Sequence, residues 1–185
     1  MNKRNMFAFA AALMFGFSAL HASAQKDPMV GGAAMYPTKN IVENAVNSKD
    51  HTTLVTAVKA AGLVDTLEGP GPFTVFAPTN EAFDKLPAGT VDTLLKPENS
   101  ATLKKVLTYH VVAGKMTSKD IAKKIKEGKG KATLTTVEGG TLTAMMVGGK
   151  LVLTDEKGGT STVTIADVYQ SNGVIHVVDT VLMPN

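Results

Sequence analysis

The chain has 185 residues, with 19 Lys and Arg against 16 Asp and Glu, a formal net charge of +3 and no cysteine. This length suits one domain with a sizeable core, and the lack of cysteine excludes disulfide bonds and thiolate metal sites. The small net charge gives no general attraction to nucleic acid, so we expect no nucleic-acid partner.

The first residues have the pattern of an export signal. Lys3 and Arg4 precede 15 apolar residues, from 6 to 20, and Ala22-Ser-Ala24 supplies the small residues of a cleavage site. The apolar run is shorter than the ~20 residues of a spanning helix. We therefore predict a signal peptide at 1–24, with an uncleaved anchor as the alternative. Cleavage leaves 161 residues, a net charge of about +1 and no membrane segment, in a periplasmic or secreted protein.

The mature chain begins with residues 25–36, which are rich in Gly and Ala and lack periodicity, so we predict a flexible leader there. The ordered domain is predicted over 37–184. Apolar residues recur at helical spacing in 41–46 and 54–61, which predicts two helices.

The next segments predict strands and short helices in alternation. Residues 73–77 are predicted as a buried strand that ends at Pro78, after which Thr79 can cap a short helix. The apolar stripe of 101–107 predicts a helix that leads into a strand at 109–112.

The pattern changes after a helix that begins near residue 117. Thr117 and Asp120 have capping-box spacing, and Ile121 and Ile125 lie one turn apart. Short Thr-rich segments separated by glycines follow, at 132–137, 141–147, 150–154, 162–167 and 174–178. Helices followed by hairpins predict an α+β domain with an antiparallel β-sandwich or wedge.

Three segments identify a known family. They read Thr74-Val-Phe-Ala-Pro-Thr-Asn-Glu-Ala-Phe83, Leu107-Thr-Tyr-His-Val-Val112 and Asn172-Gly-Val-Ile-His-Val-Val-Asp-Thr-Val-Leu-Met-Pro184. Together they resemble the signature segments of the fasciclin (FAS1) domain. The chain as a whole resembles a bacterial secreted protein with a single FAS1 domain. The resemblance implies the FAS1 fold, in which N-terminal helices pack on the β-wedge, and an exported non-enzymatic module for cell adhesion or extracellular-matrix interaction.

The resemblance also implies four adhesion candidates. Tyr109 and His110 match a segment implicated in integrin binding by animal members, and Asp167 and Val168 stand where those members have an Asp-Ile motif. The alternative for the Tyr-His pair is structural, and we favour it. In a strand the two side chains would point to opposite faces. His110 would then bond near one of three polar residues and link the first and last segments; these residues are Thr79, Asn80 and Asp179.

A lysine-rich stretch offers a second kind of site. Residues 115–131 hold seven lysines against Asp120 and Glu127. The lysines are Lys115, Lys119, Lys123, Lys124, Lys126, Lys129 and Lys131. They predict either a patch for polyanions or an ordinary solvated helix face, and we favour the latter. The patch would suit the alternative function, a periplasmic or secreted protein that binds a polysaccharide or small ligand.

Neither catalysis nor a metal site is indicated. The chain has no nucleophile motif and no phosphate-binding Gly-rich loop leading into a helix. The mature histidines are scattered: we expect His51 to be exposed at a helix start and His176 to lie in a covered strand. We therefore expect no enzyme activity, metal or cofactor, and a monomer whose partner is a cell-surface or matrix protein or glycan.

Overall fold

The computed structural model describes residues 27–185, so the predicted signal peptide lies outside the described residues. The start of the described chain differs from the predicted leader at 25–36. Strands β1 (Met29–Val30) and β2 (Ala33–Ala34) form an antiparallel hairpin. The side chains of Val30 and Met35 are buried in the core beside the first helices. The packed domain therefore begins before residue 37, because these two apolar side chains find a place in the core.

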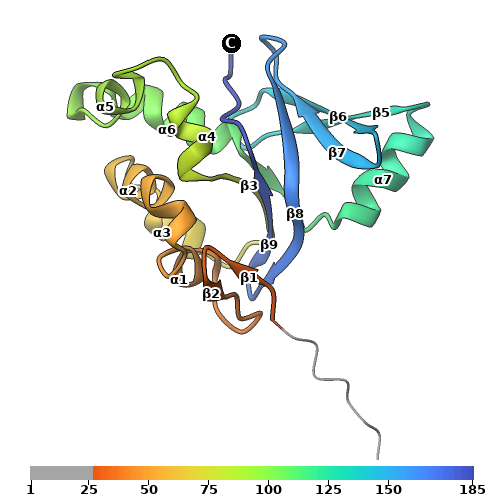
Figure 1. Cartoon of the computed structure of the whole chain (residues 1–185), viewed down its shortest axis with the longest axis horizontal. Helices are drawn as coiled ribbons and strands as arrows, with labels where there is room; N and C mark the ends of the chain where they lie inside the picture. The colour runs from red at the N-terminus through yellow and green to blue at the C-terminus, as the bar shows by residue number, and fades with distance from the viewer. Residues whose placement is uncertain (1–26) are drawn as a thin grey trace, which may run out of the picture.

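Seven α-helices are found among residues 27–185. They are α1 (Ile41–Ala45), α2 (Thr52–Ala60), α3 (Val64–Glu68), α4 (Asn80–Asp84), α5 (Thr90–Leu94), α6 (Ser100–Tyr109) and α7 (Ser118–Glu127). Short 3₁₀ helices at Lys49–His51 and Pro97–Asn99 precede α2 and α6. In Figure 1, α1 to α6 lie on one side of the sheet, and α7 lies alone at the opposite edge of the molecule.

The remaining strands form one mixed sheet. They are β3 (Phe73–Pro78), β4 (Val111–Ala113), β5 (Lys131–Thr135), β6 (Thr141–Val147), β7 (Lys150–Thr154), β8 (Thr160–Gln170) and β9 (Gly173–Val178). Their order is β4-β3-β9-β8-β7-β6-β5. The α+β class is confirmed, but the sheet is not purely antiparallel, because β9 runs parallel to β3.

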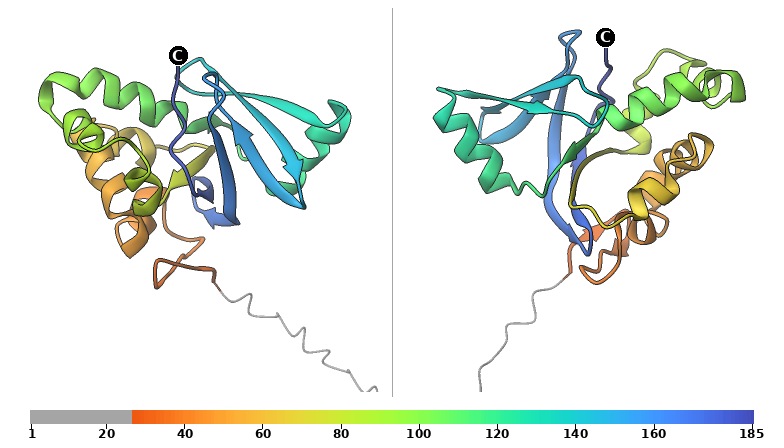
Figure 2. Two further views of the ribbon diagram at one scale, coloured as in Figure 1. Left: turned by 45° about the horizontal axis from the view of Figure 1, so that its top comes forward. Right: turned by 180° about the vertical axis from the view of Figure 1, so that it is seen from behind.

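The sheet curves until its two edge strands approach each other (Figure 2). An isolated bridge pairs Val112 of β4 with Thr136, just after β5, and the Val137 amide donates to the Val111 carbonyl at 2.7 Å. The strands therefore form a nearly closed barrel, in which β9 and the long strand β8 lie near the centre of the strand order.

Two apolar clusters fill the domain. The helical core, between α1–α6 and the sheet, includes Leu54, Val75 and Ile175. The hairpin core, between α7 and β5–β8, includes Phe76 and Leu153. Val75 and Phe76 are neighbours in β3 but belong to different cores, because successive side chains of a strand point to opposite faces. The sheet thus separates a helical half of the domain from a hairpin half.

Candidate interaction surface

The Tyr-His pair lies between the two halves of the domain and is not in a strand. Tyr109 is the last residue of α6 and His110 is its C-cap, so the predicted strand at 109–112 begins only at Val111. Tyr109 is 0% exposed and His110 is 2% exposed. Both side chains can be buried because the pair stands where a helix ends on the sheet and both of its sides are covered. This corrects the expectation that the pair lies in a strand.

Every polar atom of the His110 ring has a backbone partner. Nδ1 lies 2.8 Å from the Val106 carbonyl and donates to it, and Nε2 accepts the Leu182 amide at 3.0 Å. The His110 carbonyl accepts the Phe76 amide at 2.9 Å. Burial lowers the pKa of His110 to about 4, so the ring is neutral at pH 7. The residue links the first and last signature segments, as expected of a structural role, but through partners other than those predicted.

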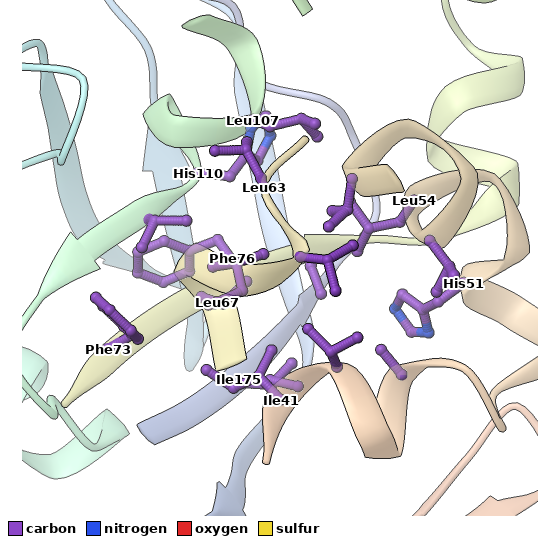
Figure 3. A pocket seen from close by; sticks show the side chains of 18 of the residues that line it. Ile41, His51, Leu54, Leu63, Leu67, Phe73, Phe76, Leu107, His110 and Ile175 are labelled. Atoms are coloured by element: carbon purple, nitrogen blue, oxygen red, sulfur yellow. The ribbon is translucent and has the colours of Figure 1, made fainter. Parts of the chain in front are cut away.

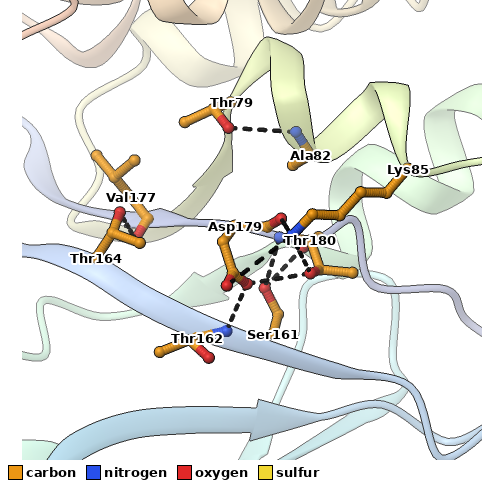
Figure 4. Close-up of polar contacts among 9 residues, drawn as sticks. All are labelled: Thr79, Ala82, Lys85, Ser161, Thr162, Thr164, Val177, Asp179 and Thr180. Carbon is orange, nitrogen blue, oxygen red and sulfur yellow. Dashed lines mark hydrogen bonds and ion pairs between the residues drawn. The ribbon is translucent and has the colours of Figure 1, made fainter.

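The three predicted partners of His110 take part in separate contacts, and Figure 4 shows those of Thr79 and Asp179. Thr79 caps α4 by accepting the Ala82 amide at 3.2 Å. Asp179 accepts the Thr162 amide at 2.8 Å and so joins the end of β9 to β8. Thr79, Asp179 and His110 do not form one network.

Asn80, the remaining predicted partner, holds the start of α2. Its side-chain carbonyl accepts the Thr53 amide at 3.0 Å, and its amide group donates to the Lys49 carbonyl at 2.8 Å. Its contacts therefore belong to the helical half and do not include His110.

Asp167 attaches α7 to the sheet. It lies in a bulge of β8 with φ of +59°, a conformation that Asp adopts more readily than most residues. One carboxylate oxygen accepts the Ser118 amide at 2.7 Å, and the other accepts the Ser118 hydroxyl. Because Ser118 opens α7, this contact places a negative charge at the helix N-terminus, where it is favourable.

His176 supports the same attachment from below. It is fully buried, as predicted for a covered strand, and stacks on Phe76 with 5.6 Å between ring centroids. Its Nε2 donates to the Met116 carbonyl at 2.9 Å, and its Nδ1 accepts the Asp167 amide at 3.3 Å. Burial lowers the pKa of His176 and keeps the ring neutral. The loop that leads into α7 is therefore held by both Asp167 and His176.

The four adhesion candidates do not form an exposed site. Val168 is 0% exposed and belongs to the helical core, and Tyr109 and His110 are also internal. Asp167 is half-buried, and its carboxylate is occupied by Ser118. Of the four, only Asp167 reaches the surface. The sequence did not predict this, because burial depends on packing across the sheet, which a local motif does not determine. Val168, Tyr109 and His110 cannot contact a partner in this conformation.

The predicted lysines, by contrast, are all on the surface. Each of the seven between 115 and 131 is exposed, while Ile121 and Ile125 on the inner side of α7 are buried. Lys115 lies over the Tyr169 ring, 4.9 Å from its centroid. The capping box at the start of α7 is formed as predicted. The lysines leave α7 with a strongly positive outer side.

A shallow groove of about 360 Å³ runs between α7 and β6–β8, beside these lysines. Lys119 and Lys150 line it together with Met146. Met146 is 46% exposed, and its neighbour Val147 is 55% exposed. We call the seven lysines and this groove the α7 face. Sequence reasoning missed Met146 and Lys150. The signal for Met146 was the loss of alternation at the end of β6, where two consecutive apolar residues cannot both point inward.

Within residues 27–185, no group of three or more His, Cys, Asp and Glu side chains is placed to hold a metal ion. No helix in that range is long and apolar enough to cross a membrane.

The chain is similar to a known domain family and to several known proteins. The model of the Fasciclin domain matches residues 49–184. Protein sll1483 of Synechocystis is 48% identical over 86% of this chain and 82% of its own length. Immunogenic protein MPB70 of Mycobacterium bovis is 38% identical over 76% of this chain, and cell surface glycolipoprotein MPB83 is 34% identical over 86%. This chain spans 66% of MPB70 and 61% of MPB83.

The fold is also that of a solved structure, the FAS1 domain pair from the insect cell adhesion molecule Fasciclin I. The TM-score is 0.69 at 22% identity, over 78% of this chain and 51% of that one. At this identity the likeness establishes the fold alone.

Proposed function

Because the chain belongs to the fasciclin (FAS1) domain family, we propose that it is an exported, non-enzymatic module for adhesion or matrix interaction, and that it binds through the α7 face. The relative MPB83 is named a cell surface glycolipoprotein, and the insect protein a cell adhesion molecule. These names support a partner of the same kind, a cell-surface or matrix protein or glycan. The signal-like segment at 1–24 supports export to the periplasm or the exterior.

One observation above all favours the α7 face. It combines exposed positive charge with a partly apolar groove, and the Asp167–Ser118 contact holds it in a fixed position. Surfaces that bind partners pair apolar contact area with complementary charge at the rim. A fixed helix also loses little conformational freedom on binding, which favours affinity.

Deletion of the gene followed by complementation tests this function. We expect deletion to reduce attachment of the cells to a surface, and the wild-type gene to restore it. The double variant Lys123→Glu, Lys124→Glu should fail to restore attachment, since both lysines lie on the exposed side of α7.

The matched control is Lys96→Glu, Lys104→Glu, which changes the net charge equally. Lys96 follows α5 and Lys104 lies in α6, at the opposite side of the molecule (Figure 1). This control should restore attachment fully. Normal attachment of the deletion strain would refute the adhesion function. Equal restoration of attachment by the two double variants would show that the α7 face is not the binding surface.

A second candidate function is the binding of an acidic polysaccharide. The seven exposed lysines between 115 and 131 favour it, because only Asp120 and Glu127 offset them within that stretch. Their charges attract a polyanion while the ionic strength is low enough to leave them unscreened.

Retention on a sulfated polysaccharide column under a salt gradient tests this candidate. The wild-type protein and the Lys96, Lys104 control should elute at the same salt concentration, and the Lys123, Lys124 variant earlier. Elution of all three in the void at low salt would exclude polyanion binding at this face.

A further inference from the structure

A cavity of about 70 Å³ lies inside the helical half of the domain. It is enclosed by α1, α2 and α3 on one side and by β3 and β9 on the other (Figure 3). Its wall consists mainly of aliphatic and aromatic side chains, such as Ile41, Leu54, Leu67 and Phe73. Val137, which is 47% exposed, also lines it, so one part of the wall lies close to the surface. Apolar cavities of this kind remain dry and accept small apolar molecules.

His51 lies in this apolar wall, with a ring that points inward from the start of α2 (Figure 3). The residue is 3% exposed, which overturns the expectation of an exposed histidine. Its Nδ1 lies 2.9 Å from the hydroxyl of Ser48, which is also buried. Its Nε2 is buried and has no hydrogen-bond partner among the described residues. An unpaired buried polar atom is destabilising, so a partner for Nε2 would be stabilising.

The second histidine of the wall does not share this property. Both ring nitrogens of His110 are occupied by Val106 and Leu182. His51 therefore offers the cavity a hydrogen-bonding site that His110 does not.

The ring of His51 is neutral, which limits the group it can recognise. Burial lowers the pKa of His51. A backbone contact with Ala77, which falls outside normal hydrogen-bond geometry, and the charge of Asp50 oppose this effect only in part. Depending on which nitrogen carries the proton, Nε2 donates or accepts one hydrogen bond. A hydroxyl group fits either state, since it can both donate and accept. A charged group does not fit, because an apolar wall would leave it unpaired.

We propose that this cavity is a binding site for a small neutral molecule with an apolar body of a few carbon atoms and one hydroxyl group, which hydrogen-bonds to Nε2 of His51. The body fills the space between the helices and the sheet, and the hydroxyl satisfies Nε2 of His51, which has no partner among residues 27–185. The site lies in the helical half and is separate from the α7 face.

Titration of the ¹⁵N-labelled protein with 1-butanol and with 1-chlorobutane tests the proposal. The two probes share a chain, but only the alcohol hydrogen-bonds. Both should shift amide resonances of α1–α3 and β3 at millimolar concentration and leave those of β5–β7 unchanged. In His51→Leu, the affinity for 1-butanol relative to 1-chlorobutane should fall roughly three- to tenfold, which corresponds to one net hydrogen bond. Comparing this affinity ratio between the wild-type protein and His51→Leu cancels the different hydration of the two probes.

Two further measurements keep the proposal falsifiable. Val58→Phe, which fills the cavity from α2, should abolish binding of both probes. If His51→Leu does not fold, the ¹⁵N resonance of His51 Nε2 in the wild-type protein should move with 1-butanol and stay in place with 1-chlorobutane. Absence of binding by both probes would overturn the proposal. An unchanged affinity ratio in His51→Leu would refute the assignment of the hydroxyl to His51.

Discussion

The two halves of the domain are packed differently. The hairpin core lies under strands whose side chains alternate between buried and exposed, and the hydroxyl of its Tyr109 both donates to the Thr141 carbonyl, at 2.7 Å, and accepts the Glu156 amide, at 3.2 Å. The helical core encloses a cavity of about 70 Å³ and a histidine nitrogen without a partner. Hairpins hold their register through neighbouring strands, whereas short helices depend on distant contacts for their position. The packing of the helical half leaves room for a ligand. The packing of the hairpin half provides a rigid base for α7.

The largest expected effect is a difference between two matched truncations. Leu153→Ala, in the fully buried hairpin core, should lower the free energy of unfolding by about 4 kcal/mol, because it opens a new cavity. Leu54→Ala enlarges a cavity that already exists, and atoms beside a cavity make fewer contacts. We therefore expect a smaller loss in the free energy of unfolding, about 2 kcal/mol. Urea unfolding measures both values. Equal losses would contradict the difference in packing.

The next effect is a loss of stability in acid. The pKa of His110 is about 4 in the folded protein, against about 6.5 in an unfolded chain, and burial also lowers the pKa values of His51 and His176. The unfolded state therefore binds more protons below pH 6.5, and stability falls as the pH drops from about 6.5 to about 4. His110 alone contributes about 3 kcal/mol to this loss.

Urea unfolding at several pH values measures this slope, and His110→Leu should make it shallower. His51 and His110 line the cavity, and β5–β8 contain no histidine. As the pH drops, the protection of amides against hydrogen exchange, relative to their intrinsic rates at each pH, should therefore fall in α1–α3 before it falls in β5–β7. A simultaneous fall of protection in both halves would show that acid does not distinguish them.

The smallest effect compares two polar side chains. Tyr109→Phe should cost about 1 kcal/mol, because it removes a hydroxyl that serves both Thr141 and Glu156. His51→Leu should change the stability by less than about 0.5 kcal/mol, since the lost Ser48 bond is offset by removal of an unpaired buried nitrogen. Thermal unfolding of both variants, without added ligand, measures the difference. A clear loss in His51→Leu would mean that Nε2 is already satisfied in the free protein.

Local patterns predicted much of the fold because they involve residues close in sequence. The capping box of Thr117 and Asp120 and the Thr79 cap of α4 require only a helix start. The alternating strands after residue 131 require only one covered face. The Tyr-His segment misled us because a short run of apolar and β-branched residues suits either a strand or the end of a helix.

The sequence by itself determined the family, the α+β class and the exposure of the lysines on α7, since these follow from motif wording and from short-range periodicity. The tertiary structure decided which motif residues reach the surface. Val168 and His51 are buried because elements far apart in the chain pack over them. Likewise, the parallel pairing of β3 with β9 joins residues about a hundred positions apart. Such long-range contacts depend on the packing of the whole chain, and they alone created the cavity beside His51.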